Sequence, residues 1–359
     1  MKNCIKILNL DNLQHNVIEI KKLISPKTKL CAVVKSDAYG HNAQKICTFL
    51  KDKVDYFAFS NNAEAIVIKK LFKTPCLIIG AFSEEHLKTA LKLNIIVSVE
   101  NLEQVKILNH YAKSLNKIAK YHLKIDSGMH RLGITTQQDF NHFLKETAKL
   151  SNSKLVGIFS HFGSGETFIC PRTEKQAISF LEITQNSPPS IIKHLCNSTN
   201  LLTHNHYSLD MVRTGISLYG YSDPRFKPVM QIKAKILAIN EISKGEFIGY
   251  GNAHQAKSNL KIATIGIGYA QGLPRLWGEN GFVLVNGKQA KFVANICMDM
   301  SIIDITNLNV NIGDYVTILD TNPILNAEII ANSCGTISYE ILTNFKNIEV
   351  SAINEQIKN

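Results

Sequence analysis

The feature that most constrains the fold is an alternation of short apolar runs with longer segments of helical period between about residues 30 and 220. This alternation is typical of parallel strands joined by crossover helices. Helices are expected over residues 101–115, 136–150 and 173–184. The runs begin near Leu30, Tyr56, Cys76, Ile95, Tyr121, Leu155, Ile191 and Met211. Eight such units predict an α/β fold, a closed TIM-type (β/α)8 barrel with its active site at the carboxyl ends of the strands.

The last connection of this barrel is short. Few residues separate Ser198 from Met211, so the helix between them must be short as well. An open, doubly wound parallel sheet is therefore an alternative to the closed barrel.

The pattern changes after about Pro228. Residues 229–242, 260–270, 281–305 and 314–320 are strand-like, and Asn286-Gly287 predicts a hairpin turn. We therefore expect two domains, a barrel over residues 1–228 and a mostly β domain over residues 229–359. Residues 1–23 are charged and helix-like.

The composition excludes several classes of protein. The 359 residues carry a net charge of +11, but the lysines are scattered, so neither nucleic acid nor a membrane surface is expected as a partner. The N-terminus lacks the apolar core of a signal peptide, and no apolar run is long enough to span a membrane, which favours a cytoplasmic protein.

The cysteines and histidines do not form a ligand pattern. The 8 cysteines are irregularly spaced without a CxxC pair, which favours free thiols over a disulfide framework. His204 and His206 could share a strand face, but an ordinary polar role is favoured over a metal site.

Polar residues recur where the predicted barrel strands end, and they would converge on one mouth of the barrel. Lys35 follows the run CAVV, so its amine would lie in a partly desolvated pocket, where a lowered pKa makes it nucleophilic. Ser198 and the backbone of residues 213–216 offer groups that an anion such as phosphate needs. The convergent set comprises Lys35, Lys124, Arg131, His161, Asn197, Ser198 and Arg213.

These residues lie in motifs that resemble those of bacterial alanine racemases. The motifs are VVKSDAYGHN, LKIDSGMHRLG, SHFGSGE, NSTN, VRTGISLYG, IGYAQG, CMDM and TISYEI, in the order of the family, from residue 31 to about 342. The family combines an N-terminal (β/α)8 barrel with a C-terminal β domain and depends on pyridoxal 5'-phosphate. The resemblance implies interconversion of L- and D-alanine, with D-alanine supplied for peptidoglycan.

The resemblance also implies a two-base mechanism. Lys35 is similar to the lysine that holds the cofactor covalently and acts as one base, and Tyr269 is similar to the opposing base. Because the family supplies this tyrosine from the neighbouring subunit, a homodimer with shared active sites is expected. His161 and Arg213 resemble the residues that support the tyrosine by hydrogen bonds. A free tyrosine, with a pKa near roughly 10, would otherwise be a poor base at neutral pH.

Arg213 resembles the family's partner of the pyridine nitrogen. Since a guanidinium keeps its proton, the nitrogen is expected to stay unprotonated, which limits side reactions. Arg131 and the backbone of Met298 resemble the anchors of the substrate carboxylate. Lys124 matches a lysine that is often carbamylated in the family, and an ordinary lysine is the alternative. The expected cofactor-binding set comprises Lys35, Tyr39, Asn197, Ser198, Arg213, Gly215, Ile216 and Tyr339.

Four residues near these motifs receive a structural interpretation. Asn197, although included in the cofactor-binding set, and Asp299 are interpreted as structural rather than catalytic. Tyr219 and Tyr250 are interpreted as packing or interface residues.

Three features depart from the family pattern. Gln271 stands where GYADG is usual, Ala294-Asn295 replaces a Gly-Arg pair, and the C-terminus lacks the common Val-Pro-Arg ending. We expect these changes to affect the substrate entryway and the dimer interface rather than the bases.

Alternative functions remain at this point. A racemase for another small amino acid such as serine fits the same anchors. A decarboxylase with the same two domains is disfavoured by Arg213, because those relatives place a carboxylate there. A non-enzymatic pyridoxal-phosphate carrier lacks the second domain and a counterpart of Tyr269.

Overall fold

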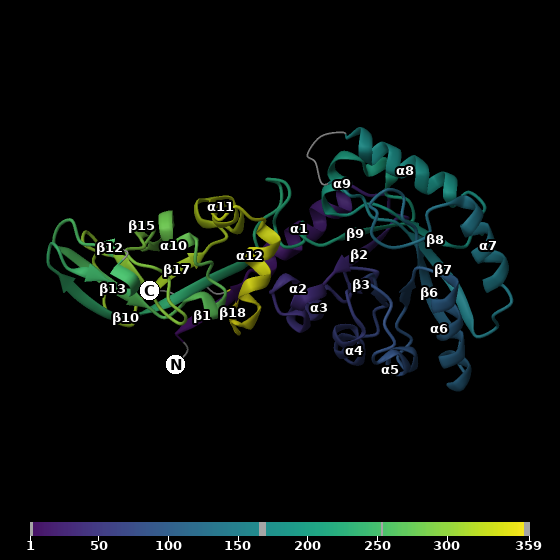
Figure 1. Ribbon diagram of the computed structural model, residues 1–359, viewed down its shortest axis with the longest axis horizontal. Coiled ribbons are helices and arrows are strands. Elements are labelled where there is room, and N and C mark those ends of the chain that lie inside the picture. The colour runs from purple at the N-terminus through teal and green to yellow at the C-terminus, as the bar shows by residue number, and fades with distance from the viewer. Residues whose placement is uncertain (1–2, 165–169, 253, 355–359) are drawn as a thin grey trace. The chain divides into compact units, whose positions relative to one another are not determined.

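The computed structural model describes residues 3–164, 170–252 and 254–354 (Figure 1). The chain forms two compact units. Residues 17–38 and 43–218 make up the barrel unit, and residues 1–16, 39–42 and 219–359 make up the β unit. No described helix has the length and apolar character needed to cross a lipid bilayer.

The barrel unit contains the eight parallel strands that the sequence predicts. They are β2 (Lys29–Val33), β3 (Tyr56–Phe59), β4 (Cys76–Ile78), β5 (Val97–Val99), β6 (Ala119–Lys124), β7 (Ser153–Phe159), β8 (Ile192–His194) and β9 (Met211–Thr214). They form two four-stranded sheets in the orders β4-β3-β2-β9 and β5-β6-β7-β8.

The two sheets join at both seams, so the barrel is closed. A parallel bridge between Leu77 and Ile96 links β4 to β5. At the other seam, the Arg213 N–H donates to the Cys196 carbonyl at 3.0 Å. The prediction of a closed barrel is therefore confirmed, and the alternative of an open doubly wound sheet is wrong.

Helices follow the barrel strands, and several begin at side-chain caps. Asn101 caps α6 by accepting from Gln104 N–H, and Thr136 caps α7 by accepting from Asp139 N–H. The connection after β8 holds a short helix, as expected. The helices are α2 (Lys35–Tyr39), α3 (Ala43–Leu50), α4 (Asn62–Leu71), α5 (Leu87–Lys92), α6 (Leu102–Ser114), α7 (Gln137–Thr147), α8 (Pro171–Ile183), α9 (Ser198–Thr203) and η1 (Asn205–Tyr207), with α1 (Leu10–Lys22) before β2.

The β unit is built around the long strand β10 (Met230–Ile242), which pairs with β1, β13 and β17. Its other strands are β1 (Cys4–Leu8), β11 (Phe247–Ile248), β12 (His254–Gln255), β13 (Leu260–Ile265), β14 (Phe282–Val285), β15 (Lys288–Lys291), β16 (Ser301–Asp304), β17 (Tyr315–Leu319) and β18 (Val350–Ile353). Its helices are α10 (Trp277–Asn280), α11 (Ala327–Ser333) and α12 (Ser338–Asn344), with 3-10 turns η2 (Tyr250–Asn252), η3 (Tyr269–Gln271), η4 (Pro323–Leu325) and η5 (Phe345–Asn347).

The hairpin between β14 and β15 turns at Asn286-Gly287, as the sequence predicts. Asn286 has a φ of 50° and Gly287 a φ of 77°, the left-handed pair that a type I′ turn requires. The prediction of a helical N-terminus is wrong for residues 4–8. These residues form β1, which is hydrogen-bonded to β10 on one side and β18 on the other, because pairing with distant strands overrides the local pattern.

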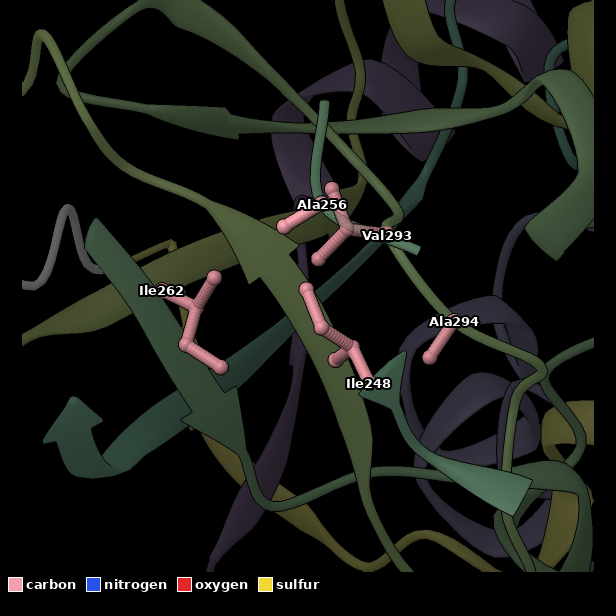
Figure 2. Packing of buried hydrophobic residues seen from close by; sticks show 5 residues of the cluster. All are labelled: Ile248, Ala256, Ile262, Val293 and Ala294. Carbon is pink, nitrogen blue, oxygen red and sulfur yellow. The ribbon is translucent and has the colours of Figure 1, made fainter. Parts of the chain in front are cut away.

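The β unit contains a small cluster of buried apolar residues (Figure 2). It contains Ile248, Ala256, Ile262, Val293 and Ala294. Ala294, one of the departures from the family pattern, is buried here. A Cβ added at Gly249 would lie 2.7 Å from the Ala294 Cβ. The space between these two residues therefore has no room for a larger side chain.

Candidate active site

Five of the predicted site residues surround one pocket in the barrel unit. They are Lys35, Lys124, Arg131, His161 and Arg213, and the pocket has a volume of about 300 Å³. Lys35 follows β2, Lys124 ends β6, His161 lies just after β7 and Arg213 lies near the end of β9. The pocket thus lies at the carboxyl ends of the strands, where (β/α)8 barrels hold their active sites.

Lys35 begins a strained turn. Ser36, Asp37, Ala38 and Tyr39 all have φ between 53° and 55°, although none is glycine. The left-handed conformation costs roughly 1–2 kcal/mol per residue, so surrounding contacts must hold the turn. Asp37 supplies two of these contacts, because its N–H donates to Glu64 Oε1 at 3.3 Å and its Oδ1 accepts from Ala43 N–H at 2.7 Å.

The two pocket lysines have lowered pKa values. Burial, followed by the positive charge of Arg131, lowers the pKa of Lys35, whereas Glu64 opposes the shift. Burial, followed by Arg213 and Arg131, lowers the pKa of Lys124 to about 7. The Lys124 Nζ lies 4.6 Å from the centre of the Phe159 ring. Both amines are therefore more easily deprotonated, and more nucleophilic, than ordinary lysines.

Arg131 lies at the end of a loop that is organised by Asp126. Oδ1 of Asp126 accepts the N–H groups of residues 128, 129 and 130 at 2.9 to 3.0 Å, and Oδ2 accepts that of Arg131 at 2.6 Å. Although burial alone would raise the pKa of Asp126, these four donors hold it below its usual value. The loop therefore fixes the backbone from which the exposed Arg131 side chain extends.

Arg213 is buried, with 3% of its surface exposed, and four of its five N–H groups are already engaged. Nη1 donates to His194 Nδ1 at 2.7 Å and to the His194 carbonyl at 3.1 Å. Nη2 donates to the carbonyls of Ser160 at 2.7 Å and Leu195 at 2.9 Å, and lies 3.4 Å from His161 Nδ1. The described residues supply no partner for Nε–H, which leaves one charged donor for a ligand.

Ser198 and Gly215, two members of the expected cofactor-binding set, lie within hydrogen-bond distance of each other. The Ser198 hydroxyl accepts the N–H of Gly215 at 2.9 Å and that of Ser217 at 3.3 Å, and Ile216 lies between these donors. Asn197 is the N-cap of α9, where its side chain accepts from Asn200 N–H. This contact gives Asn197 a structural role.

Tyr269 and Met298 lie together within the β unit. Tyr269 begins η3 and is 45% exposed, and the neighbouring Ala270 N–H donates to the Met298 carbonyl at 2.9 Å. Gln271 has a distinct role here, because its Nε2 donates to Asp299 Oδ1 at 2.9 Å and its Oε1 accepts from Gly268 N–H. This residue therefore closes the turn that carries Tyr269.

The other tyrosines singled out in the sequence, Tyr39, Tyr219, Tyr250 and Tyr339, also lie in the β unit. The ring centre of Tyr39 lies 4.9 Å from that of Tyr219 and 5.8 Å from that of Tyr339. Burial, with a smaller contribution from Tyr339, raises the pKa of Tyr39, so its hydroxyl stays protonated and can donate. Tyr219 is fully buried and Tyr250 is 75% exposed.

Several structural details were missed or misjudged at the level of sequence. Asp126, Phe159 and Glu100 all belong to the pocket or its supports, and only Asp126 lies in a motif that could have pointed to it.

His204 and His206 do not share a strand face. They lie after α9 and in η1, and both approach Oε1 of Glu174, at 3.6 and 3.5 Å. The last two residues of the motif SHFGSGE, at 165 and 166, lie outside the described residues.

All 8 cysteines are free thiols, as expected. The C-terminal segment that lacks the Val-Pro-Arg ending forms the end of α12, η5 and β18.

The fold and the pocket define a class of two-part enzymes in which a (β/α)8 barrel precedes a mostly β domain. Residues 8–223 match the family described as "Alanine racemase, N-terminal domain", and residues 229–351 match "Alanine racemase, C-terminal domain". The chain belongs to the alanine racemase family, a family of isomerases.

Individual relatives agree with this assignment. The alanine racemase of Methanococcus maripaludis is 32% identical over 93% of this chain and 94% of its own. The structure of the alanine racemase of Clostridium difficile 630 has a TM-score of 0.90 and 35% identity, covering 96% of this chain and 93% of that one. The alanine racemase of Bartonella henselae, a structure with covalently bound pyridoxal phosphate, has a TM-score of 0.88 and 25% identity, covering 98% and 99%.

Proposed function

We propose that this protein interconverts L-alanine and D-alanine by a two-base mechanism with pyridoxal 5'-phosphate bound to Lys35. The observation that carries the proposal is the gathering of Lys35, Lys124, Arg131, His161 and Arg213 around one pocket in a chain of the alanine racemase family. The pocket volume falls within the roughly 300–1,000 Å³ of small-molecule sites.

The residues present fit the cofactor. The lowered pKa of Lys35 makes its amine available to a carbonyl group, and the Nε–H of Arg213 is a donor suited to a pyridine nitrogen that carries no proton. The Ser198 hydroxyl and the Ile216 N–H suit a phosphate, and the Gly215 N–H, which donates to Ser198 in this structure, would turn to the phosphate once it is bound. Tyr39 and Tyr339 can add phenolic donors. The covalent cofactor of the Bartonella henselae relative supports this assignment.

When bound, the cofactor withdraws electrons from the α-carbon of the substrate and so makes its proton removable. The protein must then take a proton from one face of that carbon and deliver another to the opposite face. We assign these two tasks to Lys35 and Tyr269, with Lys35 acting on the D-enantiomer and Tyr269 on the L-enantiomer. His161 would support the ionised form of Tyr269 by a hydrogen bond, and Arg213, whose Nη2 lies 3.4 Å from His161 Nδ1, would follow His161 in this sequence towards the cofactor.

We propose a homodimer in which Tyr269 acts in the active site of the neighbouring subunit. The β unit exposes apolar side chains of the kind that marks protein interfaces. One of them, Met298, accepts through its carbonyl the N–H of Ala270 in the turn that carries Tyr269. The exposed set comprises Phe247, Tyr250, Leu276, Met298 and Met300.

The substrate carboxylate is assigned to Arg131 and the backbone of Met298. Arg131 can make a bidentate contact to a carboxylate, and Asp126 holds its loop in place. We further propose that Lys124 is carbamylated. Its pKa of about 7 leaves a large neutral fraction, and the neutral amine attacks carbon dioxide and releases one proton. The resulting anion would pair with Arg131.

The domain boundary and the cellular role complete the proposal. The two family matches support a boundary in sequence near residue 228, between a PLP-binding barrel domain of residues 1–228 and the domain of residues 229–359 that contributes Tyr269. Residues 1–16, 39–42 and 219–228 nevertheless pack within the β unit. We propose a cytoplasmic enzyme that provides D-alanine for peptidoglycan.

The purified protein with added pyridoxal phosphate tests this function. Chiral chromatography should show D-alanine from L-alanine and the reverse, with a final ratio near one because the enantiomers have equal free energy. L-Serine in parallel measures substrate breadth. If serine is converted and alanine is not, the assignment of alanine is wrong, and if neither is converted while cofactor is bound, the racemase assignment is wrong.

A further inference from the structure

Two buried histidines form a line behind Arg213. His122 lies in β6 and His194 ends β8, and both are 0% exposed. His122 Nδ1 lies 2.8 Å from His194 Nε2, and His194 Nδ1 lies 2.7 Å from Arg213 Nη1. The His194 ring also stacks on Phe159 at 4.9 Å with an interplanar angle of 5°. The line therefore runs from the interior of the barrel to the guanidinium.

The proton positions along this line follow from the chemistry of its ends. A guanidinium only donates, so His194 Nδ1 must accept. A neutral His194 then carries its proton on Nε2 and donates to His122 Nδ1. His122 in turn carries its proton on Nε2, for which the described residues provide no hydrogen-bond partner. The network thus assigns the same tautomer to both rings.

Glycine at position 157 makes room for the inner end of the line. A Cβ at Gly157 would lie 2.4 Å from both Cε1 and Nε2 of His122, far inside van der Waals contact. Any larger residue would displace the His122 ring. Gly157 is therefore required by the position of His122.

Burial, together with the positive charges nearby, keeps both histidines neutral. Burial, followed by the charge of Arg213, lowers the pKa of His122 to about 3. Burial, followed by Arg213, His122 and Lys124, places the pKa of His194 well below its usual value. A protonated His194 would present an N–H to the N–H of Arg213, so protonation would break the line.

We propose that His194, oriented by His122, is a positioning residue that leaves Nε–H of Arg213 as its single donor toward the cofactor. The His194 ring and three backbone carbonyls take all four Nη hydrogens, and this fixes the rotation of the guanidinium. The inference rests on the proposed function, in which Arg213 faces the pyridine nitrogen.

The first test measures the tautomers directly. ¹⁵N NMR of histidine-labelled protein, with the signals of His122 and His194 assigned by substitution, should show both rings neutral and protonated on Nε2 from roughly pH 5 to 9. A protonated ring, or a proton on His194 Nδ1, would overturn the proposal. The measurement does not depend on activity.

The second test measures cofactor binding in His194→Phe, His122→Phe and Gly157→Ala. We expect pyridoxal phosphate to bind about ten-fold more weakly to these variants, because the loss of one hydrogen bond to a charged group has an effect of about this size. The absorbance of the bound cofactor should become pH-dependent in these variants and stay pH-independent in the wild type. His204→Phe removes another fully buried histidine of the barrel unit and serves as the control, with unchanged affinity and spectrum.

The outcomes separate the two proposals. If His194→Phe binds the cofactor with wild-type affinity and an unchanged pH profile, the positioning role is wrong. If the wild type binds no pyridoxal phosphate, the proposed function fails, whereas the NMR result still decides whether the two tautomers are as assigned.

Discussion

The carboxylate of Asp126 accepts the backbone N–H of Arg131 at 2.6 Å, and the same carboxylate accepts three further N–H groups of that loop. A single buried charge therefore holds the backbone that carries the proposed carboxylate anchor. A substitution that never touches substrate should consequently weaken substrate binding.

Asp126→Ala leaves four N–H groups without their acceptor. We expect it to lower the free energy of unfolding by about 1–3 kcal/mol and to raise KM for alanine more than it lowers kcat. Urea unfolding and steady-state kinetics measure the two effects. Asp139→Ala, which removes an exposed carboxylate at the start of α7, is the control. A wild-type KM in Asp126→Ala would contradict the assignment of this loop.

The same carboxylate predicts a pH dependence of stability. Because the pKa of Asp126 is lower in the folded chain than in the unfolded one, its stabilising contribution is complete above the ordinary aspartate pKa and is lost as the pH falls through the folded value. The free energy of unfolding of the wild type should therefore fall more steeply than that of Asp126→Ala on acidification below about pH 4. Parallel slopes would show that Asp126 does not titrate in this way.

Lys35→Ala should abolish covalent attachment of pyridoxal phosphate. Reduction of the wild type with borohydride, followed by peptide mapping, should place the cofactor on Lys35, and the variant should carry none. Lys45→Ala alters a lysine of helix α3 and should behave as the wild type. Labelling of another lysine in the wild type would remove Lys35 from its assigned role.

Tyr269→Phe removes the proposed base for L-alanine but keeps the ring. Cofactor binding should be unchanged. The rate of proton abstraction from L-alanine should fall by about 10²-fold or more, and the rate of abstraction from D-alanine should fall by less. Measurement of the primary deuterium isotope effect in each direction resolves this asymmetry. Tyr250→Phe, an exposed tyrosine of the same unit, is the matched control. Equal full activity in both directions would reject Tyr269 as a base.

The lowered pKa of Lys124 predicts that KM for alanine depends on carbon dioxide. The neutral amine is the reactive form, and with a pKa of about 7 it increases as the pH rises through neutrality. Removal of bicarbonate should therefore raise KM for alanine, and its return should restore KM more fully at pH 8 than at pH 6. A ¹³C NMR carbamate signal after addition of labelled bicarbonate, absent in Lys124→Arg, would identify the group. No signal and no dependence would leave Lys124 an ordinary lysine.

The barrel was predictable because its signals are local. Each apolar run is followed by a helical segment, and caps such as Asn101 and Thr136 mark where the helices begin. The strand at residues 4–8 was not predictable in this way, because its partners β10 and β18 lie far along the chain. Local periodicity contains no information about such pairings.

Five residues that line the pocket were predictable from the sequence, but the contacts that support them were not. Motifs pointed to Lys35, Arg131 and Arg213, because the chemistry of these side chains is distinctive. The hydrogen bonds of His122 and His194 depend on the register of β6 and β8 in the closed barrel. The left-handed turn at residues 36–39 could not be predicted either, because none of these four residues is glycine.

The most direct test of the central claim follows the α-proton of L-alanine during racemisation in deuterated water, with simultaneous chiral analysis of the product. Two bases on opposite faces predict that the first D-alanine formed carries solvent deuterium, because the base that delivers the proton is not the one that removed it. D-Alanine that retains the original proton would contradict the two-base mechanism. If the cofactor-bound protein shows no exchange at all, the proposal that it is a racemase is wrong.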